Sequence, residues 1–124
     1  MGRYLEFWDL NAYKIAFQLS NYVWEVVIKW DHFAKDTIGK QWARAVDSTS
    51  ANIAEGFGRF TKKDKVGFYR YSFASINESV DWLEKAKKRQ LVTVEQYEFI
   101  LSELNKLPRE INSLIKFTNE KLAI

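Results

Sequence analysis

The sequence predicts an all-α protein that folds as an antiparallel up-down-up-down four-helix bundle. Apolar residues recur at spacings of three and four along nearly the whole chain, which is the period of one helix face. No stretch of strand length alternates apolar and polar residues, and no long linker rich in Gly, Ser or Pro interrupts the pattern. Four long helices joined by short turns must run antiparallel to their neighbours.

The first helix is predicted over residues 9–32, and the second continues to about Glu55. After His32, Asp36 or Thr37 is expected to cap the second helix, because short polar side chains accept hydrogen bonds from free backbone N–H groups. Each helix carries one continuous apolar stripe for the core. The stripes are Ala12, Ala16, Leu19, Val23, Val26 and Trp30 in the first helix and Trp42, Val46, Thr49 and Ile53 in the second.

The third and fourth helices begin at recognisable caps. Thr61 is followed three residues later by Asp64, which resembles a capping box, and Thr93 is followed by Gln96 in the same way. Pro108 in the fourth helix predicts either a kink near residues 104–107 or a restart of the helix with Pro108 in its first turn, and we favour the kink because the stripe keeps its register across it. The core stripes are Val66, Tyr69, Phe73, Ile76, Val80 and Leu83, then Tyr97, Leu101, Leu104, Ile111, Ile115, Thr118 and Leu122.

Length and composition predict one domain over residues 1–124 with an ample core, since 47% of the 124 residues are hydrophobic. The chain has no Cys, which excludes disulfides and thiolate metal sites and suits a cytoplasmic protein. No run without charges is long enough to cross a membrane, so no membrane partner is expected. A net charge of +3 permits a polyanionic partner without requiring one.

Residues 50–63, SANIAEGFGRFTKK, place two glycines beside positive charges. A dinucleotide-binding fingerprint would need a preceding strand and a third Gly where Thr61 stands, and the chain has no P-loop sequence. The glycines are therefore interpreted as structural. We expect Gly56 to hold a positive φ as a helix C-cap, Phe57 to pack back on the core, and Gly58 to allow the turn.

The same region resembles a known family. Arg44-Ala45-Val46 and the stretch from Ser50 to Arg59 are similar to the central signature of the four-helix-bundle proteins encoded in intervening sequences of bacterial 23S ribosomal RNA genes. The structural signature residues are Asn52, Glu55, Gly56 and Gly58. Further similar stretches are Phe7-Trp8-Asp9-Leu10 with Ala16, Phe68-Tyr69-Arg70-Tyr71 with Ser79, and Leu114-Ile115-Lys116, whereas Asp47-Ser48-Thr49 and Pro108 depart from the family pattern.

This resemblance implies a ring-like homo-oligomer, commonly a pentamer, with no established enzymatic activity. A more distant resemblance, to accessory proteins of diversity-generating retroelements, implies work with a reverse transcriptase and binding of nucleic acid. The residues themselves show a second apolar stripe on the first helix, which is either a broad core face or a subunit interface. Its members are Tyr13, Phe17, Trp24 and Ile28.

Catalytic and metal-binding patterns are missing from the sequence. His32 is the only histidine, no Glu-x-x-His pair exists, and no nucleophile-elbow motif is present. Acidic residues of the third helix have Lys partners at helical spacing, which is typical of a solvated face with ion pairs. We therefore expect no enzyme, no metal and no cofactor.

Two clusters of basic residues remain as functional candidates. The cluster over residues 85–89 ends the third helix, where cations interact favourably with the helix dipole. The other lies at the start of that helix, where the dipole disfavours cations, and predicts contacts to phosphates of structured RNA or an RNA–DNA hybrid. The alternative is a protein-interaction scaffold with a solubilising charge. The predicted nucleic-acid-binding residues are Arg59, Lys62, Lys63, Lys65 and Arg70.

Overall fold

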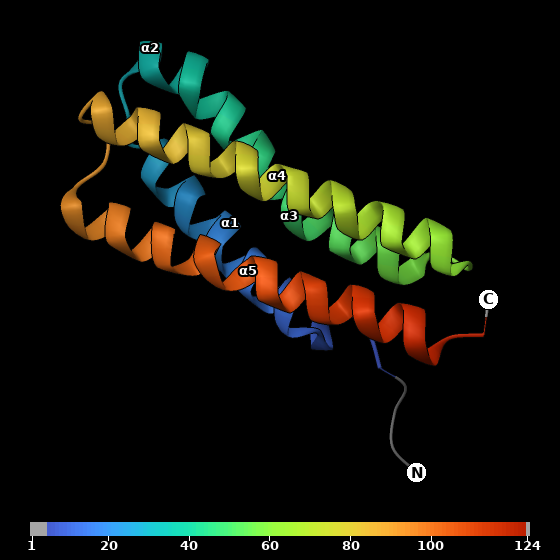
Figure 1. Ribbon diagram of the computed structural model, residues 1–124. Helices are drawn as coiled ribbons and strands as arrows, with labels where there is room; N and C mark the ends of the chain where they lie inside the picture. The colour runs from blue at the N-terminus through green and yellow to red at the C-terminus, as the bar shows by residue number, and fades with distance from the viewer. Residues whose placement is uncertain (1–4, 124) are drawn as a thin grey trace.

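The protein is built of four long helices that lie side by side (Figure 1). The computed structural model describes residues 5–123, and these form helices without any strand, which confirms the predicted all-α class. No helix in this part of the chain combines the length and apolarity needed to span a membrane. The elements are η1 (Phe7–Asp9), α1 (Asn11–Val27), α2 (His32–Ala34), η2 (Lys35–Gly39), α3 (Lys40–Gly58), α4 (Lys62–Lys88) and α5 (Val94–Lys121).

Each long helix packs against two others, in the cyclic order α1, α3, α4, α5. Helices α1 and α4 are therefore diagonal to each other, as are α3 and α5. As the residue numbers of the contacts increase along one helix, the numbers of their partners decrease along the neighbouring helix. Neighbouring helices therefore run antiparallel. The pairs that give these directions are Ser20–Asp47 and Val27–Gly39, Thr49–Ser75 and Gly56–Tyr69, and Glu84–Tyr97 and Lys62–Asn119.

In α1 and α3 the core follows the stripes that the sequence predicts, whereas in α4 and α5 it does so only in part: Leu101 and Ile115 are half-buried, and Ile100 and Leu107, outside the predicted stripe, are fully buried. Every predicted stripe residue of α1 and α3 is buried except Trp30, which is half-buried. The Trp30 ring stacks on the buried Trp42 at 5.9 Å between centroids, and its indole N–H donates to the backbone oxygen of Leu91 at 2.8 Å. The residues after α1 are thereby tied to the turn between α4 and α5.

Both predicted threonine caps are present. The Thr61 hydroxyl accepts a hydrogen bond from the backbone N–H of Asp64 at 3.1 Å, and Thr93 and Gln96 form a complete capping box. Helix α5 runs from Val94 to Lys121 with Pro108 inside it, so the proline does not divide the helix. Thr93 and Thr61 fix where the two longest helices begin.

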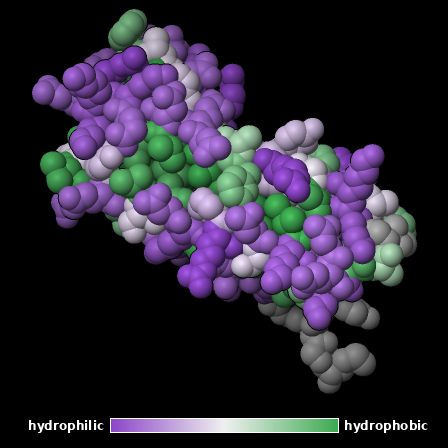
Figure 2. Space-filling model, in the orientation of Figure 1, coloured by the Kyte–Doolittle hydropathy of each residue, from purple (hydrophilic) through white to green (hydrophobic). Residues whose placement is uncertain are grey.

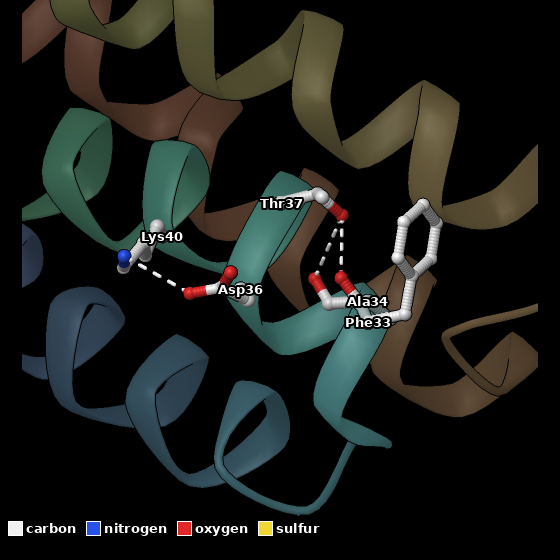
Figure 3. Close-up of polar contacts among 5 residues, drawn as sticks. All are labelled: Phe33, Ala34, Asp36, Thr37 and Lys40. Carbon is white, nitrogen blue, oxygen red and sulfur yellow. Dashed lines mark hydrogen bonds and ion pairs between the residues drawn. The ribbon is translucent and has the colours of Figure 1, made fainter.

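The expectation that Asp36 or Thr37 caps the second helix is wrong, because the cap is Asp31. The Asp31 carboxylate accepts from the backbone N–H of Ala34 at 3.0 Å, and the helical backbone then continues through α2, the π-helical segment η2 and α3. Figure 3 shows the actual roles of the two residues: Asp36 pairs with Lys40 at 3.0 Å, and the Thr37 hydroxyl donates back to the Phe33 carbonyl at 2.7 Å. Both side chains are thus used inside a helix.

Small and hydroxyl-bearing residues line the contact between α3 and α4. The hydroxyls of Thr49 and Ser75 share a buried hydrogen bond of 2.7 Å, and Ser72 donates to the Thr49 carbonyl at 2.8 Å. These side chains add little bulk between the helices, and each polar atom in this trio has a partner, as burial requires. Thr49, a departure from the family pattern, is accommodated in this network.

The prediction of a positive φ at Gly56 is also wrong. Among the described residues no glycine has a positive φ, and α3 continues past Gly56 to Gly58. Gly56 is instead buried against the ring of Tyr69, where a Cβ atom would lie 2.7 Å from Cε1. The glycine is needed for the close approach of two helices and not for a left-handed cap. The predicted inward packing of Phe57 is met in part, since this side chain is half-buried.

Candidate nucleic-acid interface

The turn between α3 and α4 presents the predicted cluster of basic residues. Helix α3 ends at Gly58, Arg59 has an extended backbone, and Thr61 already caps α4. The chain therefore reverses over three residues, Arg59 to Thr61. At this end of the bundle, the first turn of α4 lies beside the last turns of α3 and α5.

Three of the five predicted cations are exposed, and we call Arg59, Lys63 and Arg70 the basic face. Within residues 5–123, neither Lys63 nor Arg70 has an ion pair or hydrogen bond from its side chain. These two lie seven residues apart on one side of α4, which corresponds to about 10 Å along the helix. Arg59 pairs with Glu55 at 3.7 Å and lies over the Phe68 ring at 4.5 Å.

The other two predicted cations are half-buried and bind backbone oxygens. The Lys62 ammonium donates to the Asn119 carbonyl at 3.2 Å, and that of Lys65 donates to the Phe57 carbonyl at 2.6 Å. These carbonyls belong to the last turns of α5 and α3, which carry the negative end of each helix dipole. Burial lowers the pKa of Lys65 below its ordinary value. Lys62 and Lys65 thus have a structural role that the sequence analysis did not foresee.

Exposed aromatic rings accompany the basic face, which the sequence analysis also missed. Phe60, at the tip of the turn, is 78% exposed, and Tyr71 on α4 is 62% exposed. The Phe68 ring meets Tyr71 edge-on at 5.7 Å between centroids and carries the Arg59 guanidinium on its face. The exposure of Phe60 could have been predicted from its position directly before the capping Thr61, because a residue in so short a turn has little surface to pack on.

The signature residues lie in the last turns of α3. Asn52 donates to the Ser48 carbonyl at 2.9 Å and to its hydroxyl at 2.8 Å, and Glu55 pairs with Arg59. Gly58 has no atom within 4 Å of the position that a Cβ would take. These residues therefore shape the end of α3 and orient Arg59.

A mostly apolar cavity of about 400 Å³ lies beneath this end of the bundle. Lys65, Tyr69 and Thr118 are its polar lining residues, and the rest of the lining is apolar side chains of Phe57 and of residues near both ends of the described chain. Burial raises the pKa of Tyr69 to about 12. The cavity is walled off from the basic face by α4, since Lys65 and Tyr69 point inward while Lys63 and Arg70 are exposed.

The second basic cluster, at the end of α4, makes local contacts. Lys85 pairs with Asp81 at 2.6 Å and lies over the Trp82 ring at 4.6 Å. Lys87 lies over the Tyr97 ring at 4.2 Å. Lys88 and Arg89 are exposed without such contacts within the described chain, and all four cations sit where the helix dipole favours them.

The second apolar stripe of α1 remains open to solvent. Phe17 and Trp24 are 50% and 53% exposed, Ile28 is exposed, and Tyr13 is half-buried with its ring stacked on Phe17 at 5.7 Å. We call these four residues the α1 stripe. On the face drawn in Figure 2, hydrophobic side chains form separate patches among hydrophilic ones. Tyr13 packs against the core, whereas the other three residues of the α1 stripe are exposed.

Metal ligands do not gather anywhere in residues 5–123: no group of three or more His, Asp or Glu side chains is placed to hold an ion. The only histidine, His32, is exposed in the first turn of α2.

Comparisons with known proteins agree with this architecture. No curated protein matches the chain. A crystal structure of a protein of unknown function from the S23 ribosomal protein family of Bacteroides thetaiotaomicron VPI-5482 superposes with a TM-score of 0.75. The two chains are 22% identical over 85% of this chain and 98% of that one, which shows a shared fold. The model of the family described as 23S rRNA-intervening sequence protein matches residues 8–113, so this chain belongs to that family.

Proposed function

We propose that the protein is a non-enzymatic homo-oligomer that binds nucleic acid, a structured RNA or an RNA–DNA hybrid, through its basic face. The observation that carries this proposal is the pair Lys63 and Arg70. Both are exposed on one side of α4, and within the described chain neither has an acidic partner. Of the five predicted cations, Lys62 and Lys65 bind backbone oxygens and Arg59 pairs with Glu55, whereas Lys63 and Arg70 are available for phosphate groups.

The position of the pair supports contact with a polyanion. Two cations about 10 Å apart along a rigid helix can neutralise phosphates without a conformational change. Arg59 adds a third charge whose guanidinium is already held by Glu55 and Phe68, so little side-chain entropy is lost on binding.

Self-association through the α1 stripe would leave this face free. Because α1 and α4 are diagonal in the bundle, their outward sides point in opposite directions. A subunit that buries the stripe of α1 against any surface of another copy other than α4 keeps Lys63 and Arg70 at the outside of the assembly. Cyclic symmetry would repeat the basic face once per subunit and raise the affinity for a long polyanion.

Fluorescence anisotropy with a labelled ribosomal RNA fragment at about 50 mM salt tests the proposal. We expect the double variant Lys63→Ser and Arg70→Ser to bind at least about ten-fold more weakly than the parent, for all sequences alike. The matched control is Arg109→Ser with Lys116→Ser, which removes two exposed cations with the same seven-residue spacing from α5. If both double variants lose affinity equally, the binding is not located at the basic face. If the parent does not bind, the protein is a scaffold for other proteins instead.

A further inference from the structure

Phe60 has no structural reason to be aromatic. Its ring is 78% exposed at the tip of a three-residue turn, and no ring contact or cation contact of Phe60 exists within residues 5–123. A polar residue would serve such a turn without exposing apolar surface to water. The nearest functional feature is the basic face, because Phe60 directly follows Arg59 in the chain.

A second exposed ring lies beside the same face, next to Arg70 in α4. Tyr71 is 62% exposed, and it is linked to the turn by the Phe68 ring, which touches both Tyr71 and Arg59. The basic face is therefore accompanied by two exposed aromatic rings, one from the turn and one from α4. Aromatic rings alternating with cations are the usual composition of surfaces that bind single-stranded nucleic acid.

The surface between and beside the cations carries only small side chains. Lys63, Gly67, Arg70 and Ala74 recur at spacings of four and three and so share one side of α4. A Cβ on Gly67 would have no atom within 4 Å, so nothing in the described chain covers this surface. A nucleotide can lie here with its phosphates near the two cations and its base against a ring.

The extent of the face limits what it can hold. Beyond Ala74 the same side of α4 carries Glu78 and Asp81, whose carboxylates repel phosphates. The basic part thus extends from Lys63 to Ala74, about 16 Å at the rise of an α-helix. This length suits a short unpaired segment and gives few phosphate contacts to a long duplex.

We propose, on the basis of the proposed function, that the basic face takes unpaired nucleotides, with bases stacked on Phe60 and Tyr71 and phosphates bound by Lys63 and Arg70. Bases inside a duplex are stacked on each other and cannot offer their faces to a protein ring, whereas loops and single strands can. The ligand class is therefore a single-stranded or looped RNA segment, read by stacking and charge.

The test compares an unstructured RNA of twelve nucleotides with a blunt RNA duplex of the same length, by fluorescence anisotropy at low salt. We expect the parent to bind the single strand about ten-fold or more tightly than the duplex. The double variant Phe60→Leu with Tyr71→Leu should lose this preference, and Phe60→Trp with Tyr71→Phe should retain it. Phe33→Leu, which changes an equally exposed ring in α2, is the control and should have no effect.

Three outcomes would overturn the inference. If the parent binds duplex and single strand equally, or the leucine variant keeps the preference, stacking is not used, although the proposed function stands. If the leucine variant changes the sedimentation coefficient of the assembly, the rings are contacts between copies of the chain. If the parent binds neither RNA, the proposed function fails and the inference fails with it.

Discussion

The Cα atom of Gly56 in α3 lies against the ring of Tyr69 in α4, so closely that a Cβ at position 56 would be 2.7 Å from Cε1 of the ring. The Lys65 carbonyl would be 3.1 Å from the same Cβ, so a rotation of the Tyr69 ring alone would not make room for it. This contact explains a signature glycine by packing. It also fixes the spacing of the two helices that hold the basic face.

Replacing Gly56 with Ala should therefore lower the free energy of unfolding by about 1 to 3 kcal/mol, as expected for overpacking. Urea denaturation followed by circular dichroism measures the change. The control is Gly67→Ala, inside α4 with open space around it, which should raise the free energy by about 0.5 to 1 kcal/mol because Ala favours helices. A Gly56→Ala variant as stable as the parent would show that α3 and α4 are not in close contact here.

Tyr69 should make the protein less stable at high pH. Burial raises its pKa to about 12, above the ordinary value of 10.0. Because the unfolded chain releases this proton first, the contribution of Tyr69 to stability is complete below about pH 10 and is lost as the pH rises to about 12. Urea midpoints measured from pH 9 to 12 should fall more steeply for the parent than for Tyr69→Phe. Parallel pH profiles would mean that the hydroxyl is not buried.

Lys65 should contribute to stability, whereas Lys63 should not. Lys65→Met keeps the apolar stem but removes the ammonium group that binds the Phe57 carbonyl, so we expect a loss of about 1 kcal/mol. Lys63→Met changes an exposed side chain and should stay within about 0.5 kcal/mol of the parent. Thermal and urea unfolding compare the two. Equal effects would contradict the division between structural and free cations.

The α1 stripe should hold subunits together. The double variant Phe17→Ser with Trp24→Ser removes two large exposed side chains, and the dissociation constant of the assembly should rise at least about 100-fold. Sedimentation velocity at micromolar concentration detects the release of 14.7 kDa chains. Phe33→Ser, an exposed ring outside the stripe, should leave the assembly unchanged. If the parent itself sediments as a monomer, the stripe is not a subunit interface.

The helices could be predicted from the sequence because burial follows a local pattern. Alternation at three and four residues places side chains on one face whatever the tertiary contacts are, and the hydroxyls of Thr61 and Thr93 act on N–H groups only three residues away. The capping role of Asp31 could not be predicted, because it depends on where the second helix begins. The π-helical segment keeps the backbone helical from His32 onward, and nothing local distinguishes it from a loop followed by a new helix.

The details of the candidate interface depend on residues distant in sequence. Lys62 donates to the Asn119 carbonyl at the end of α5, and Gly56 packs against the Tyr69 ring. Neither contact can be predicted from the spacing of residues within one helix. Within α4 alone, nothing offsets the unfavourable interaction of first-turn cations with the helix dipole. In the bundle, the antiparallel neighbours end beside it and supply carbonyl oxygens. Of the predicted interface, the exposed cations without an acidic partner within residues 5–123 are Lys63 and Arg70.

The salt dependence of RNA binding tests the central claim, that Lys63 and Arg70 contact phosphates, most directly. The dissociation constant of the parent for single-stranded RNA should rise steeply between about 50 and 200 mM salt. In Lys63→Ser with Arg70→Ser, the slope of log affinity against log salt should be smaller by about 1.4, since each lost contact on a single strand removes about 0.7. The Arg109→Ser and Lys116→Ser control should keep the parent's slope. A slope that is the same in the parent and the Lys63 and Arg70 variant would contradict the account.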